Sequence, residues 1–427
     1  MADSPDVAEF GGGVEGDVWS KKRTNGPTFD PLADGYFDDP YPQYALLRAR
    51  NPVHVNSRGV LFCFAYDDVR RVLIDPRSTS MERERSLPVG NRSRSRSAPP
   101  TFPLALINRD PPDHTRLRRL LSKSFTQRKI ETLATSMDRH IDGLLADLDG
   151  QARDSGEPVD LVAGLAFPLP FRVISEMLGM PDGVDNQVRN WAHDISVASD
   201  PIVTSEQVAT AVAAYQAINE YVATEVLPWK QKNKSDDLLS HLLSAEEEAK
   251  LSRAELLDNV ALLYVAGHET TSGLIGNGVL NLLRHRDQME QLRGRSDALP
   301  NAIEELNRYE SSVQFAWRYV VDDLALRDFV IPPGTMAFVS CGSANRDRHH
   351  FGESADQLDV TRADAKDSLS FGAGMHFCLG AQLARREAAL VIGKLVDRFP
   401  NMELADDPCW SRRMTFRSLD HLPVKLR

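Results

Sequence analysis

Hydrophobic residues recur along most of the chain at helical spacing, and a short region near the N-terminus also shows the alternation of strands. Residues 41–50 and 67–75 have the pattern of short helices, whereas 53–55 and 60–64 have the pattern of two hairpin strands. From residue 161 to about 244 the pattern is helical again, and prolines divide it into connected helices. We therefore expect a mainly helical chain with a smaller β-containing region.

The longest helical pattern begins at Ser252 and runs to about His285. Ser252 followed three residues later by Glu255 has the form of a capping box. The middle of the run is unusual because Glu269 places a charge among apolar residues and Thr270 is a poor helix former. Such local conflicts often mark a functional position. We expect the Thr270 hydroxyl to bond a carbonyl of its own helix and open a turn for dioxygen and water, while Glu269 relays protons as a general acid.

That stretch alone also fits a kinked core helix with Glu269 on its outer face. Ala266 and Gly267 lack bulk, so a large flat molecule can lie against them. His268 is two positions beyond Ala266, roughly 200° around the helix, and should therefore face away from that molecule.

A glycine-rich stretch, residues 371–380, surrounds Cys378 and leads into a helical pattern over 381–399. Gly372 and Gly374 allow backbone angles that are closed to other residues, and Gly380 lets the backbone approach the sulfur. Cys378 precedes a helix N-terminus, where free amides and the helix dipole favour a thiolate. A thiolate held in this way is a suitable axial ligand for haem iron.

His376, two residues before the cysteine, is placed to bond a haem propionate. Two other interpretations remain at this point. One is a buried structural cysteine beside a glycine turn. The other is zinc, which is disfavoured because His376 and Cys378 lack a second ligand pair nearby.

Composition narrows the class of protein. The chain has 427 residues, 42% of them hydrophobic, and a net charge of −11, which argues against general nucleic-acid binding. Its four cysteines are scattered, as in a reducing compartment. No apolar run is long enough to span a bilayer, so we expect a soluble, cytoplasmic monomer.

We expect a flexible tail over 1–25 and a single domain over 26–427. The Arg/Ser-rich run over 91–97 should be a solvated loop, although such a run can also bind RNA or act as a targeting patch.

The run Phe371-Gly-Ala-Gly-Met-His-Phe-Cys-Leu-Gly380 resembles the haem-binding signature of the cytochrome P-450 superfamily, and Leu383-Ala384-Arg385 resembles its bacterial continuation. The run Ala266-Gly-His-Glu-Thr-Thr271 resembles the oxygen-binding motif of the same superfamily. The resemblance covers residues 30–427. It implies a mainly α, triangular-prism fold with a smaller β-rich lobe, holding haem b between the 252–285 helix and the Cys378 loop.

The resemblance also implies roles for other residues. His114 and Arg118, four apart on one face of a basic helix, correspond to propionate-binding residues, and Arg318 corresponds to another; a solvated basic face is the alternative for the first two. Glu305 and Arg308 resemble a structural Glu-x-x-Arg pair, with Gln357 at the position of a third charged partner. Haem contacts are expected from Ala266, Phe371, Gly372, His376, Cys378 and Gly380. Substrate contacts are expected from Leu262, Ala266, Val313, Phe315 and Phe416.

The function implied is that of a haem-thiolate monooxygenase, which hydroxylates or epoxidises a small-to-medium hydrophobic organic substrate with O2. Two electrons are expected from a ferredoxin or flavodoxin-like protein with its reductase, docking near Arg116, Arg119 and Lys123. Two alternatives stay open: a peroxide-driven peroxygenase and a non-catalytic haem-based sensor. We expect no nucleic-acid and no membrane partner. The substrate is set by the variable helices around residues 191–222 and cannot be named from the sequence.

Overall fold

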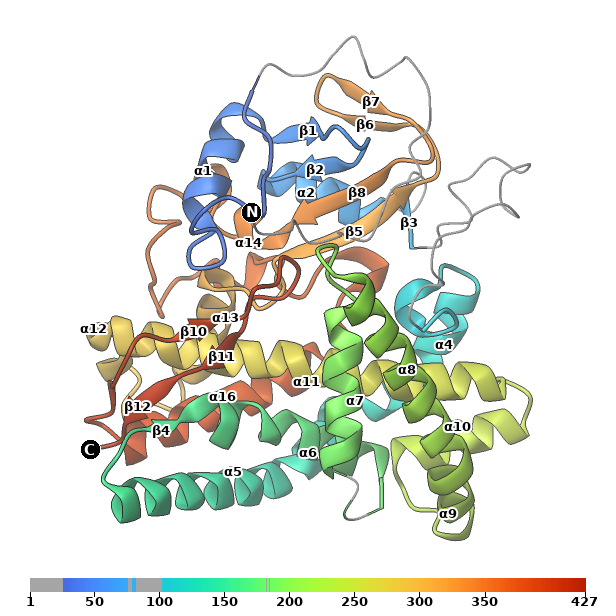
Figure 1. Ribbon diagram of the computed structural model, residues 1–427, viewed down its shortest axis with the longest axis vertical. Coiled ribbons are helices and arrows are strands. Elements are labelled where there is room, and N and C mark those ends of the chain that lie inside the picture. Colours follow the sequence, from blue (N-terminus) through green and yellow to red (C-terminus); the bar gives the residue numbers. More distant parts are fainter. Residues whose placement is uncertain (1–25, 76–78, 82–101, 182, 184) are drawn as a thin grey trace.

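A computed structural model describes residues 26–75, 79–81, 102–181, 183 and 185–427 of the chain. The predicted tail over 1–25 and the Arg/Ser-rich loop over 91–97 lie outside these residues. Figure 1 shows a large helical region, with a β-rich lobe beyond one side of it. The predicted mainly α fold with a smaller β lobe is therefore confirmed.

The helical region is built around α11 (Arg253–Arg284), which crosses its middle (Figure 1). The Ser252 side chain accepts a hydrogen bond from the Glu255 amide and the Glu255 side chain reaches back, so the predicted capping box is confirmed. Residues on nearly all faces of α11 are buried, as expected for a helix enclosed by others. Those neighbours include α6 (Pro168–Leu178), α7 (Asp185–Val197) and α16 (Ala381–Arg398).

Other helices surround this core. They are α4 (Asp113–Leu121), α5 (Gln127–Ser155), α8 (Ser205–Tyr221), α9 (Leu227–Lys232), α10 (Leu238–Glu247) and α13 (Leu299–Tyr309). Pro168 begins α6, as the predicted division of this stretch requires. Two other prolines do not divide it: Pro170 lies in the first turn of α6, and Pro228 lies in the first turn of α9, which continues α8 through a π-turn over Val222–Val226. A first turn tolerates proline because its amides have no partner within the helix.

The β-rich lobe contains a five-stranded sheet, in which only the β2–β8 pair is parallel. Its order is β1 (Val53–Val55), β2 (Leu61–Cys63), β8 (Met336–Ser340), β5 (Phe315–Val320) and β3 (Thr79–Ser80). The antiparallel β1–β2 pair confirms the predicted hairpin. The predicted short helices are present as α1 (Tyr41–Arg50) and α2 (Tyr66–Ile74), and an aromatic cluster lies between α1 and the sheet: Phe29, Tyr36, Tyr44, Phe62, Phe64 and Phe315.

The C-terminal residues return to the helical region. The strand β12 (Pro423–Lys425) pairs with β4 (Val159–Asp160) and β9 (Glu403–Leu404), and β10 (Cys409–Trp410) pairs with β11 (Leu419–His421). Between β10 and β11, the Thr415 amide donates to Asp200 Oδ2 at 2.8 Å. Because Asp200 lies between α7 and α8, the C-terminal segment is fastened to the turn that joins these two helices.

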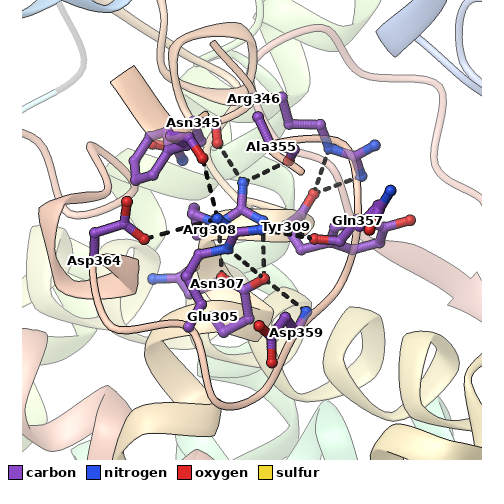
Figure 2. A network of polar contacts seen from close by, with 12 residues as sticks. Glu305, Asn307, Arg308, Tyr309, Asn345, Arg346, Ala355, Gln357, Asp359 and Asp364 are labelled. Atoms are coloured by element: carbon purple, nitrogen blue, oxygen red, sulfur yellow. Dashed lines mark hydrogen bonds and ion pairs between the residues drawn. The ribbon is translucent and has the colours of Figure 1, made fainter. Parts of the chain in front are cut away.

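A buried ion-pair network on α13 braces the segment that leads to Cys378 (Figure 2). Glu305 and Arg308 are fully buried and share two hydrogen bonds, Nε–Oε2 at 2.6 Å and Nη2–Oε1 at 2.8 Å. Arg308 also donates to the backbone carbonyls of Asn345, Ala355 and Gln357. A buried charge is tolerated only when it is paired and hydrogen-bonded, and this guanidinium meets both conditions.

The prediction that Gln357 stands at the position of the third charged partner is wrong. Gln357 contributes its backbone carbonyl, whereas the third charge is Arg362, whose Nε lies 3.2 Å from Glu305 Oε1. The network therefore keeps three charged members, and the chain supplies the third one five residues later than predicted.

We expect Arg308→Ala to destabilise the protein by about 3–5 kcal/mol, because it leaves Glu305 buried with its main partner removed. Arg293→Ala is a matched control, since Glu290 and Arg293 have the same order and spacing but are exposed; its expected cost is under about 1 kcal/mol. Urea unfolding of both variants measures the difference. Equal costs would contradict a bracing role for the buried pair.

Candidate active site

The Cys378 loop has the backbone geometry that its glycines predict. Gly372 and Gly374 both have φ of 71°, in the left-handed region. At Gly374 a Cβ atom would lie 3.0 Å from the Leu73 carbonyl oxygen, so only glycine fits against α2. The Cys378 amide donates to the Phe371 carbonyl at 2.9 Å and closes the loop just before α16 begins.

The electrostatic environment of Cys378 differs in part from the expectation. Burial raises the pKa of the Cys378 thiol, although the amides of Gly380 and Ala381 and the charge of Arg385 act to lower it. The helix N-terminus thus acts in the predicted direction, but desolvation outweighs it. The helix N-terminus and Arg385 alone therefore do not make Cys378 a thiolate. Haem iron, when bound, would supply the rest, because coordination to a metal ion deprotonates a thiol.

The other cysteines do not compete for this role. Cys63 and Cys341 are buried in the core of the β-rich lobe, and burial raises the pKa of Cys341 to about 12. Cys378 keeps an exposed surface. The described part of the chain holds no group of three or more His, Cys, Asp or Glu side chains suited to a metal ion.

Two largely buried histidines lie next to the loop, and the carboxylate beside them is that of Asp110, whose Oδ1 is 3.6 Å from His376 Nε2. The His114 and His376 rings are 4.5 Å apart, and the Nε2 atom of each is buried without a hydrogen bond. Burial, followed by the charges of His376 and Arg118, lowers the pKa of His114 to about 4. Unsatisfied buried polar atoms are costly, which indicates that a polar ligand belongs here. The two propionates of haem b fit that requirement.

Arg318 on β5 fits the same requirement. It is buried and donates to the Trp317 carbonyl at 2.7 Å and to the Met81 sulfur at 3.1 Å, rather than to a carboxylate. Burial lowers its pKa to about 10. Arg118 is placed differently, because it donates to the carbonyls of Met375 and Phe377 and so holds the Cys378 loop. Its contact with a propionate stays a prediction.

On α11, the Thr270 hydroxyl donates to the Ala266 carbonyl at 2.6 Å, as expected. The helix remains α-helical throughout, so the hydrogen bond does not open a turn. Ala266 is exposed. Gly267 instead has a packing role, because a Cβ atom there would lie 2.7 Å from Ile174 Cδ1. Its small size allows α6 to pack closely against α11. His268 is buried, with Nε2 2.9 Å from the Phe167 carbonyl, and faces away from Ala266 as predicted.

Glu269 is buried and doubly paired. Its Oε1 lies 2.7 Å from His193 Nδ1 on α7, and its Oε2 accepts from Arg413 at 2.9 Å. Burial raises the pKa of Glu269, but the hydrogen bond from His193 and the charge of Arg413 lower it to about 2. Glu269 is therefore ionised at neutral pH and is not on the outer face of a core helix. No motif in the sequence identifies its two partners; the available signal was that a buried carboxylate needs partners.

The predicted substrate contacts separate into two groups. Val313 and Phe416 are partly exposed and form an isolated antiparallel bridge, which brings β5 and the C-terminal segment together. Leu262 is almost fully buried. The prediction for Phe315 is wrong, because its ring has no exposed surface and packs in the aromatic cluster against Phe29.

The predicted basic surface is smaller than expected. Arg116 forms ion pairs with Asp113 and Glu255, so its charge is neutralised within the chain. Arg119 and Lys123 are exposed.

Among the described helices, none has an apolar stretch that could cross a bilayer.

Comparison with known proteins agrees with this site. The family model described as Cytochrome P450 matches residues 52–411. Cytochrome P450 107B1 of Saccharopolyspora erythraea is 39% identical over 94% of this chain and 99% of its own length. The vitamin D(3) 25-hydroxylase of Pseudonocardia autotrophica is 37% identical over 93% of this chain and 96% of its own. The structure of the bacillaene polyketide synthase cytochrome P450 PksS of Bacillus subtilis has a TM-score of 0.82 at 33% identity, covering 93% of this chain and 100% of that one.

We expect Cys378→Ser to abolish the thiolate-type Soret band of the reduced, CO-bound protein, because a serine oxygen cannot replace the soft thiolate ligand. Cys409→Ser, at the other exposed cysteine, is the control and should keep the wild-type spectrum. Absorption spectroscopy of freshly prepared folded protein makes the measurement. An imidazole-type band in the wild type would contradict ligation by Cys378.

Proposed function

Because this chain belongs to the cytochrome P450 family and is therefore a haem-thiolate monooxygenase, we propose that it hydroxylates or epoxidises a small-to-medium hydrophobic organic compound with O2 and electrons from a ferredoxin and its reductase. The observation that carries this proposal is the placement of Thr270 and Cys378. Thr270 lies on α11 and Cys378 lies just before the start of α16. These two helices pack against each other.

Each residue then has a defined task. When bound, haem supplies the oxygen activation that no side chain can perform. Cys378 would hold the iron, Arg318 would offset the charge of the propionates, and His114 and His376 would donate hydrogen bonds to them. The Thr270 hydroxyl, held by the Ala266 carbonyl, would keep a proton donor at a fixed position beside the reacting oxygen. Glu269 would return protons to this hydroxyl from its own side of α11.

Within this class, the proposed substrate is a medium-sized hydrophobic natural product or sterol-like molecule. The partly exposed Ala266, Val313 and Phe416 offer apolar contacts, and two relatives are named for vitamin D(3) hydroxylation and for a polyketide synthase. A spectral screen of vitamin D(3), macrolides, terpenoids and fatty acids tests this directly. Turnover with peroxide but none with ferredoxin and its reductase would instead favour a peroxygenase.

We expect Thr270→Ala to lower the yield of product per reduced nicotinamide at least severalfold and to raise peroxide release, because the variant loses the hydroxyl that places the proton. Thr270→Ser keeps a hydroxyl and is the control, with a yield close to that of the wild type. Product and peroxide are quantified in the same reactions. An unchanged yield in the alanine variant would exclude a role for Thr270 in proton delivery.

Electron transfer from an acidic ferredoxin should weaken as ionic strength rises, because the exposed charges of Arg119 and Lys123 are screened. We expect Arg119→Glu to slow reduction about tenfold at low salt. Arg58→Glu, in the exposed β1–β2 turn, is the control and should reduce at the wild-type rate. Stopped-flow reduction of the haem gives these rates, and rates independent of salt would exclude electrostatic docking.

A further inference from the structure

Glu269 joins three segments that are distant in the sequence. His193 reaches its Oε1 from α7, and Arg413 reaches its Oε2 from the segment between β10 and β11. Arg413 also donates to the Ser196 hydroxyl at 2.9 Å, one turn further along α7. The carboxylate is thus the meeting point of α11, α7 and the C-terminal segment.

The three side chains differ sharply in their access to water. Glu269 is 5% exposed and Arg413 is 11% exposed, whereas the His193 side chain is 45% exposed. A guanidinium does not release protons at physiological pH. Arg413 can therefore hold the Glu269 carboxylate in place but cannot supply it with protons. Histidine gains and loses a proton in this pH range, and His193 touches both water and Glu269.

We propose that His193 delivers protons from water to Glu269, while Arg413 holds the carboxylate in position to receive them. His193 touches neither substrate nor haem and is therefore a positioning residue that acts through Glu269. This inference rests on the proposed function, because it requires Glu269 to pass protons toward Thr270.

The proton balance is simple. Water protonates the exposed ring of His193 to an imidazolium. Its Nδ1–H bond then breaks and an O–H bond forms on Glu269 Oε1. The neutral ring and neutral carboxyl group exist only transiently, because the pKa of Glu269 is about 2 and its proton passes on toward Thr270. When the carboxyl proton has passed on toward Thr270, Glu269 is again a carboxylate paired with Arg413. The neutral ring takes its next proton from water after turning outward, which its exposure permits.

The surroundings of His193 favour its protonated form. The hydrogen bond to Glu269 raises the pKa of His193, and burial opposes this only in part. Because this pKa is raised, protonated His193 stabilises the folded protein at low pH. That contribution to the free energy of unfolding is lost as pH rises through the pKa of His193 in the folded state. The charged and titratable groups that face it are Glu269 and His268 on α11, Arg413 and Asp420 in the C-terminal segment, and Asp194 on α7 itself.

The test is His193→Gln, which keeps a hydrogen-bond donor for Glu269 but cannot carry a proton. We expect product per electron to fall about fivefold and the solvent isotope effect on turnover to increase. In the wild type, product per electron should decline as pH rises through the pKa of His193, and this decline should be absent in the variant. His140→Gln is the control, because His140 pairs with Glu176 between α5 and α6, away from Glu269.

A second measurement does not depend on turnover. NMR titration of labelled histidine in the reduced, CO-bound holoenzyme reports the pKa of His193 directly. We expect this pKa to be lower in Glu269→Gln than in the wild type, because the variant removes the negative charge 2.7 Å from Nδ1. The same pKa in both proteins would show that the two groups are not coupled and would overturn the inference.

The outcomes also separate this inference from the proposed function. If Thr270→Ala lowers the yield while His193→Gln behaves like His140→Gln, the enzyme is a monooxygenase that takes its protons by another route, and the inference is overturned. If neither Thr270→Ala nor His193→Gln changes the yield, proton delivery through Thr270 fails together with this inference, whereas the proposed function is tested separately by turnover with ferredoxin and its reductase.

Discussion

The whole architecture depends on burying nitrogen-bearing side chains in an apolar interior. A flat cofactor with two carboxylates can be enclosed only where buried groups can bind those carboxylates. Arg318 supplies a positive charge there, and His114 and His376 supply ring nitrogens whose desolvation the protein alone does not offset. Burial lowers the pKa of both histidines and of Arg318. The cofactor therefore completes the interior electrostatically as well as filling it.

Features that depend on local backbone chemistry could be predicted from the sequence. The left-handed glycines of the Cys378 loop, the capping box of α11 and the Thr270 hydrogen bond each involve residues within a few positions of one another. The longest predicted helix is α11, which crosses the middle of the helical region (Figure 1). Local rules are sufficient where the partner is a neighbour in the chain.

Features that depend on distant partners could not be predicted in this way. Gly267 was expected to face a flat molecule, but it faces Ile174, and Phe315 was expected in the substrate pocket, but it lies among aromatic rings. Glu305 pairs with Arg362 rather than with a side chain at position 357. In each case the partner is more than fifty residues away, and no periodicity in one sequence identifies it.

The hydrogen bond between Thr415 and Asp200 has a consequence for the order of folding. These residues are 215 positions apart, and a growing chain folds from its N-terminal side as it is made. The turn between α7 and α8 is therefore complete long before the residue that fastens it leaves the ribosome. Until then these two helices lack this hydrogen bond, so their turn reaches its final anchored state only after nearly the whole chain has been made.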